Sequence, residues 1–121
     1  MNNFMEACYG HYDELVEAGS AYLKGKISRG VFEETANRIL TFIRMGWKEF
    51  KSISLPPELN SKLKKEIIKA EKGFALFEQG VEKARKIADQ EKPQEELLWQ
   101  GLGLAKWGCD LLNEFIRNND F

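Results

Sequence analysis

Apolar residues recur at alternating steps of three and four along most of the chain, and this spacing constrains the fold more than any other feature of the sequence. Steps of three and four place side chains on one face of an α-helix, whereas a half-buried strand needs steps of two. No run of alternating polarity predicts a sheet. The pattern therefore predicts an all-α protein.

Three segments that contain Gly, Ser or Pro interrupt the pattern, and such residues favour helix ends. We therefore predict four helices, with Ser28 as an N-cap and Pro57 in a first turn. Their ranges are about 3–24, 29–51, 57–90 and 95–118. Short connections make antiparallel neighbours, so we expect one domain over 1–121, a four-helix up-down-up-down antiparallel bundle with a long third helix. The alternative is an extended helical hairpin that completes its core in a dimer.

Glycines return at a spacing of seven inside the third and fourth predicted helices. They are Gly73, Gly80, Gly101 and Gly108. Each interior glycine costs roughly 0.5 to 1 kcal/mol relative to alanine, so a compensating gain is expected. In a heptad register all four lie beside the core, where small residues let two backbones approach closely. We expect close helix packing there; the alternatives are a groove for a flat apolar ligand and a helix kink.

The chain turns near residue 92, and this sets the expected register of the two glycine-containing helices. An antiparallel pair folded about that point places Phe77 opposite Gly108 and Ala84 opposite Gly101. The glycines would then act as holes for facing side chains.

The fourth predicted helix carries a second apolar row outside its core seam. A helix in a monomeric bundle needs one apolar stripe, so we expect something else to cover part of this row. The residues concerned are Leu97, Leu104, Trp107 and Leu111. Candidate covers are a second copy in a homodimer, a helical protein partner or a lipid-like ligand. Scattered exposed apolar residues are also normal in monomers.

No set of residues predicts catalysis, a metal site or a cofactor. His11 is the only histidine, and no nucleophile or second metal-ligating histidine accompanies it. The two cysteines, Cys8 and Cys109, lack the spacing of metal ligands and fall on apolar seams. We expect buried free thiols, with a disulfide between them as the alternative.

The charges of the chain nearly cancel, with 18 Lys and Arg against 19 Asp and Glu, which disfavours nucleic-acid binding. A lysine row on the third predicted helix is expected to be solvated, with an acidic partner or an anionic membrane surface as the alternative. No apolar run is long enough for a membrane span, and the start does not resemble a signal peptide. We expect a cytoplasmic protein, or a secreted or periplasmic one if a signal was removed.

The stretch SLPPELNSKLKKEIIKAEKGFALFEQGVEKA, at 54–84, resembles a pattern in small bacterial helical-bundle proteins of unknown function, many of them secreted or lipid-anchored. The shared features are two prolines before a long helix, a leucine repeat and a glycine in mid-helix. The resemblance implies a helical bundle without known catalysis. The lipid-attachment cysteine that many such proteins carry after a signal is missing here.

These patterns predict a non-enzymatic module that binds a protein partner or self-associates through the apolar outer face of the fourth helix. The alternative is a carrier of a small apolar molecule in the groove between the third and fourth helices, near the four glycines.

Overall fold

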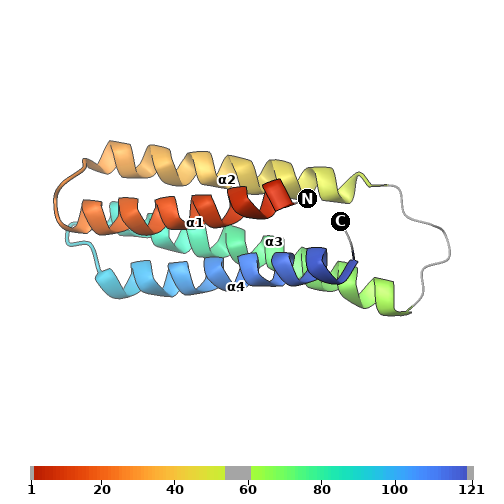
Figure 1. Ribbon diagram of the computed structural model, residues 1–121. Helices are drawn as coiled ribbons and strands as arrows, with labels where there is room; N and C mark the ends of the chain where they lie inside the picture. The colour runs from red at the N-terminus through yellow and green to blue at the C-terminus, as the bar shows by residue number, and fades with distance from the viewer. Residues whose placement is uncertain (1, 54–60, 120–121) are drawn as a thin grey trace.

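The computed structural model describes residues 2–53 and 61–119, and these fold into an antiparallel four-helix bundle (Figure 1). A short 3-10 helix, η1, follows the third α-helix. The elements are α1 Asn2–Leu23, α2 Arg29–Lys51, α3 Ser61–Arg85, η1 Lys86–Asp89 and α4 Glu95–Asn119. The predicted all-α fold is confirmed. Both chain termini lie at the same end of the bundle, where α1 and α3 begin and α2 and α4 end.

The connection from α1 to α2 has a defined geometry that local sequence explains. Gly25 adopts a φ of 73°, and the N–H of Lys26 donates to the carbonyl of Ala21 at 2.8 Å. This bond, which closes the end of α1, and the left-handed glycine together form a Schellman motif. Ser28 then caps α2, because its Oγ accepts from the Val31 N–H at 3.2 Å. The predicted N-cap is confirmed.

The third helix is shorter than predicted as a regular α-helix. Its α-helical part ends at Arg85, and the chain continues as the tighter turn of η1 to Asp89. In this turn both Ile87 and Ala88 are buried, although they are adjacent in sequence. The predicted start of this helix at Pro57 lies outside the described residues.

One hydrophobic cluster draws side chains from all four α-helices and η1. Fully buried members come from each helix, among them Leu15, Phe32, Phe77 and Leu98. The extended hairpin is therefore not the observed arrangement, because α1 and α2 pack on α3 and α4 to complete the core within one chain. None of the described helices has the length and hydropathy that crossing a membrane requires.

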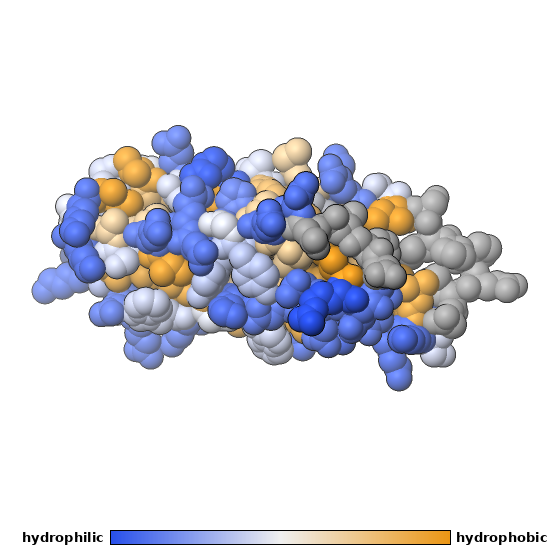
Figure 2. Space-filling model, in the orientation of Figure 1, coloured by the Kyte–Doolittle hydropathy of each residue, from blue (hydrophilic) through white to orange (hydrophobic). Residues whose placement is uncertain are grey.

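Hydrophilic residues cover most of the face that Figure 2 shows. Hydrophobic residues emerge between them in patches, one of which lies near the end of the bundle where the termini meet.

Candidate functional site

The helices α3 and α4 approach most closely at the four glycines. A Cβ built on Gly101 would lie 2.6 Å from the Ala84 nitrogen and the Gly80 oxygen. A Cβ on Gly108 would lie 2.5 Å from the Phe77 nitrogen. Such distances are far below van der Waals contact, so no other residue fits either position without moving a backbone.

The observed partners are those that the antiparallel register places opposite one another, Phe77 at Gly108 and Ala84 at Gly101. The reciprocal contacts set Gly80 against Ala105 and Gly73 against Leu112. The opposing backbone therefore occupies the volume that the glycines leave. The groove for an apolar ligand that we considered at this position is absent, and close packing accounts for the glycines.

The second apolar row of α4 is covered in part by the protein itself. Leu97, Leu104 and Leu111 are half-buried, and Leu97 packs against the hydrophobic core. Trp107 remains 48% exposed, and the Lys72 ammonium lies 4.6 Å from the centroid of its ring. Of the four residues predicted as an interaction surface, Trp107 offers the largest free area.

A second tryptophan, which the sequence analysis did not single out, shares this outer face. Trp99 is 50% exposed, and its indole N–H donates to Glu95 at 2.9 Å. Gly103 lies between Trp99 and Trp107, and a Cβ there would meet nothing within 4 Å. The spacing of four residues on either side of Gly103 is the signal by which the sequence could have shown this face.

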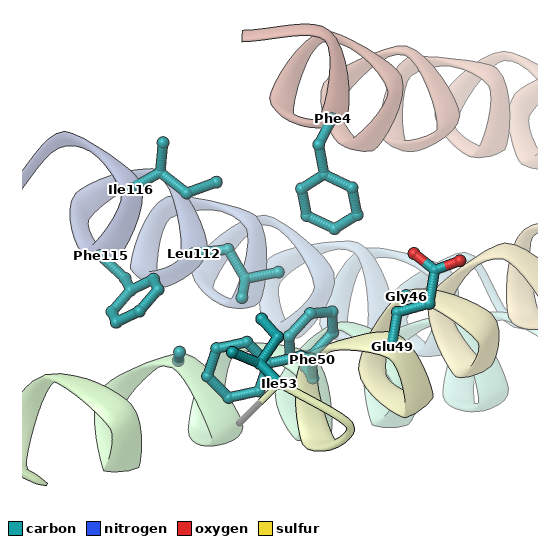
Figure 3. Close-up of a pocket in the computed structure, with 10 residues that line it drawn as sticks. Phe4, Gly46, Glu49, Phe50, Ile53, Leu112, Phe115 and Ile116 are labelled. Atoms are coloured by element: carbon teal, nitrogen blue, oxygen red, sulfur yellow. The ribbon is translucent and has the colours of Figure 1, made fainter. Parts of the chain in front are cut away.

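An apolar pocket opens at the end of the bundle where the termini meet, and we call it the end pocket (Figure 3). Its volume is about 340 Å³. All four α-helices contribute to its wall, and their side chains converge on the same space in Figure 3. The lining residues are Phe4, Gly46, Glu49, Phe50, Ile53, Ala70, Phe74, Leu112, Phe115 and Ile116.

Aromatic rings that pack against one another form part of this wall. Phe50 lies 5.6 Å from Phe74 and meets Phe115 edge-on at 5.7 Å between ring centroids. Behind Phe74, the Trp47 ring stacks at 6.0 Å with an interplanar angle of 7°. Edge-on and stacked contacts at these separations are favourable arrangements for aromatic pairs. The wall is therefore held in place by contacts within the protein.

Two small residues line the end pocket. Gly46 contributes no side chain, and a Cβ there would come within 3.2 Å of the Phe4 ring. Ala70 is buried and contributes a single methyl group. Gly46 therefore lets the Phe4 ring lie close to α2, and a larger side chain in place of Ala70 would take up part of the pocket.

Glu49 is the one ionisable residue among the described residues that line the end pocket. Its side chain is exposed and lies at the edge of the pocket in Figure 3. Within 2–53 and 61–119, its carboxylate forms no hydrogen bond or ion pair, whereas most other acidic residues near α3 and α4 do.

The titratable groups outside the end pocket do not form a catalytic arrangement in the described part of the chain. His11 lies 3.5 Å from Glu14, and the hydrogen bond from Arg38 lowers the pKa of the Glu14 carboxyl. The ring of His11 packs on Phe42. No nucleophilic side chain joins this pair, and the described residues hold no group of three His, Cys, Asp or Glu that could bind a metal ion.

Both cysteines are buried and free, as we expected of them. The Cys109 Sγ lies 3.9 Å from the Cys8 carbonyl oxygen. Burial raises the pKa of the Cys8 thiol to about 12 and also raises that of Cys109. Because the thiolate is the reactive form, neither residue is suited to nucleophilic chemistry.

Comparisons with protein-family models, with curated proteins and with solved structures found no match to this chain. The resemblance of 54–84 to small bacterial helical-bundle proteins therefore stays a prediction, and its first part, 54–60, lies outside the described residues.

Proposed function

We propose that this protein is a non-enzymatic binding protein that holds a small apolar molecule in the end pocket. The observation that carries the proposal is a volume of about 340 Å³ lined by apolar and aromatic side chains from all four helices. Small-molecule sites typically span roughly 300 to 1,000 Å³ and are mostly apolar. This site replaces the groove beside the glycines as the place for a ligand.

The volume of the end pocket limits the ligand to a small apolar molecule or group. An engineered apolar cavity of about 150 Å³ can bind benzene. A pocket of about 340 Å³ suits a fused two-ring aromatic system or an alkyl chain of similar bulk. Burying roughly 200 Å² of ligand surface is worth about 5 kcal/mol before the costs of association. Because about 5 kcal/mol corresponds to a dissociation constant of about 0.2 mM, we expect dissociation constants of about 0.2 mM or weaker.

A titration with 1-octanol, followed by NMR of the backbone amides, tests the proposal. We expect saturable shifts at Gly46 and Ala70, which line the end pocket. Ala70→Leu should weaken binding at least about tenfold, because the larger side chain fills the pocket. Ala75→Leu is the control, since it makes the same change on α3 at a partly exposed residue that does not line the pocket.

Melting curves must show that both variants remain folded, because overpacking a core costs about 1 to 3 kcal/mol. Octanol shifts located elsewhere on the protein, or equal affinity in folded Ala70→Leu and wild type, would contradict the proposal.

We also propose, as a second candidate function, self-association through the outer face of α4. The specific observation is the pair of half-exposed tryptophans on either side of Gly103, whose missing side chain leaves open space. A two-fold axis through Gly103 would bring Trp99 of one copy against Trp107 of the other, and would repeat that contact. Self-association would also explain the exposed glycine in mid-helix, since a glycine permits the close approach of a second helix.

Light scattering over a concentration series tests this second candidate. We expect the wild-type mass to rise towards that of a dimer, and Trp99→Glu and Trp107→Glu each to restore the monomer mass at the same concentrations. Met45→Glu is the control, because Met45 is exposed on α2, away from this face. A monomer mass for the wild type at all concentrations would rule out self-association.

A further inference from the structure

We infer that the end pocket selects apolar molecules that carry a positively charged amine, and that Glu49 is the group that recognises the amine. The inference rests on the proposed binding function of the pocket. It adds the chemical class of the ligand, an apolar body with an ammonium head, to the apolar volume already described.

A single carboxylate at the edge of an otherwise apolar pocket supports this inference. Nine of the ten lining residues are apolar or glycine, and Glu49 is the remaining one. Its carboxylate is exposed at the edge of the pocket, so a ligand could keep its head in water beside Glu49 while its body enters the apolar space. Amphiphilic groups are commonly held in this way, with the charge in water and the chain on apolar surface.

Two basic residues near Glu49 or the end pocket are engaged with other groups. The Lys51 ammonium lies over the Trp47 ring, at 4.4 Å from its centroid. Lys69, next to Ala70 in sequence, pairs with Glu114 at 2.9 Å. No described Lys or Arg lines the end pocket.

The basic residue that follows Ile116 also faces elsewhere. Arg117 lines a separate polar hollow on the outside of α4, together with Asp110 and Asn113. Further along α3, Glu78 and Glu82 both accept from Arg44, so this arginine is engaged there. Glu49 therefore gives the edge of the end pocket a negative charge without a described partner.

The expected selectivity is modest, because Glu49 is exposed to water. Exposed ion pairs strengthen an interaction about 1.5- to 5-fold, and like charges weaken it by a similar factor. For one alkyl chain with three different heads, we expect an ammonium to bind about threefold tighter than an alcohol and the alcohol about threefold tighter than a carboxylate. A higher salt concentration should reduce these differences in affinity, because salt screens the interaction between exposed charges.

Calorimetric titrations with octylammonium, 1-octanol and octanoate at pH 7 and low salt test the inference. We expect that order of affinity in the wild type and in the control Glu34→Gln, which changes an exposed glutamate elsewhere on α2. In Glu49→Gln the three affinities should fall within about a factor of two of one another. Competition with octanol for the same amide shifts shows that all three probes enter the end pocket.

The outcomes separate the two proposals. If all three probes bind in the end pocket of the wild type with equal affinity, the role of Glu49 is refuted and the apolar binding function stands. The role of Glu49 is also refuted if the order of affinity persists in Glu49→Gln. If no probe binds in the pocket, the binding function itself is refuted and the inference with it.

Discussion

Gly101 and Gly103 lie two residues apart on α4 and have opposite surroundings. A Cβ at Gly101 would press on the backbone of Ala84 at 2.6 Å, whereas a Cβ at Gly103 would meet nothing within 4 Å. Helix propensity favours alanine over glycine at both positions by about 0.5 to 1 kcal/mol. Because the propensity term is the same at both positions, a difference between the two changes in the free energy of unfolding measures the packing of α3 on α4.

We expect Gly101→Ala to lower the free energy of unfolding by about 2 to 3 kcal/mol, because the helices must separate to admit the methyl group. Gly103→Ala should raise it by about 0.5 to 1 kcal/mol. Urea unfolding followed by circular dichroism measures both changes. Equal effects of the two substitutions would show that the helices do not touch at Gly101.

The thiols of Cys8 and Cys109 give the bundle a dependence on alkaline pH. Burial raises the pKa of Cys8 from 9.0 to about 12, and it raises that of Cys109 in the same direction. Below pH 9 both the folded and the unfolded chain hold these protons. Above pH 9 the unfolded chain loses them first, so it binds fewer protons and the folded state loses stability as the pH rises.

Each thiol should lower the free energy of unfolding by about 1 to 1.4 kcal/mol per pH unit between about pH 9.5 and pH 11. The double variant Cys8→Ala, Cys109→Ala should show a shallower decline, even if its stability at pH 7 is lower. Urea unfolding of both proteins at several pH values measures the slopes. Parallel slopes would mean that the thiols titrate in the folded protein as they do in the unfolded chain.

At the scale of the element, the sequence was sufficient to predict the helices and the register of one helix pair. The three- and four-residue spacing and Ser28 place α2 at Arg29–Lys51, as observed. Glycines repeated every seventh residue on two antiparallel helices leave few alternative registers, so Phe77 falls at Gly108. Periodicity could not show that the last turn before Gln90 tightens into η1, because it reports which face is apolar and not the pitch of the turn.

The outer face of α4 was harder to predict for a physical reason. The amount of α4 that α3 covers depends on how closely the two helices approach. The glycines bring the two backbones together, and Leu104 and Leu111 are half-buried in the folded bundle. We expected these leucines to need a cover from outside the monomer. Trp99 was not among the predicted surface residues, because its exposure becomes evident only in the folded bundle.

At the scale of the whole molecule, the end pocket could not be predicted from any single helix. Phe50, Phe74 and Leu112 each fit an apolar seam, and nothing in their spacing distinguishes a filled core from a hollow one. The end pocket lies where residues of all four α-helices come together at one end of the bundle. Such a site depends on the relative heights of all four helices, which the sequence pattern does not determine.

The most direct test of the central claim, an end pocket that binds an apolar molecule, is a crystal structure of the protein soaked with 1-octanol. We predict electron density for the alkyl chain between Phe4, Phe74 and Phe115, with α3 and α4 still in contact at Gly80 and Gly101. An end pocket closed by its own side chains, with octanol bound only on the outer face of α4 or absent, would contradict the proposed function.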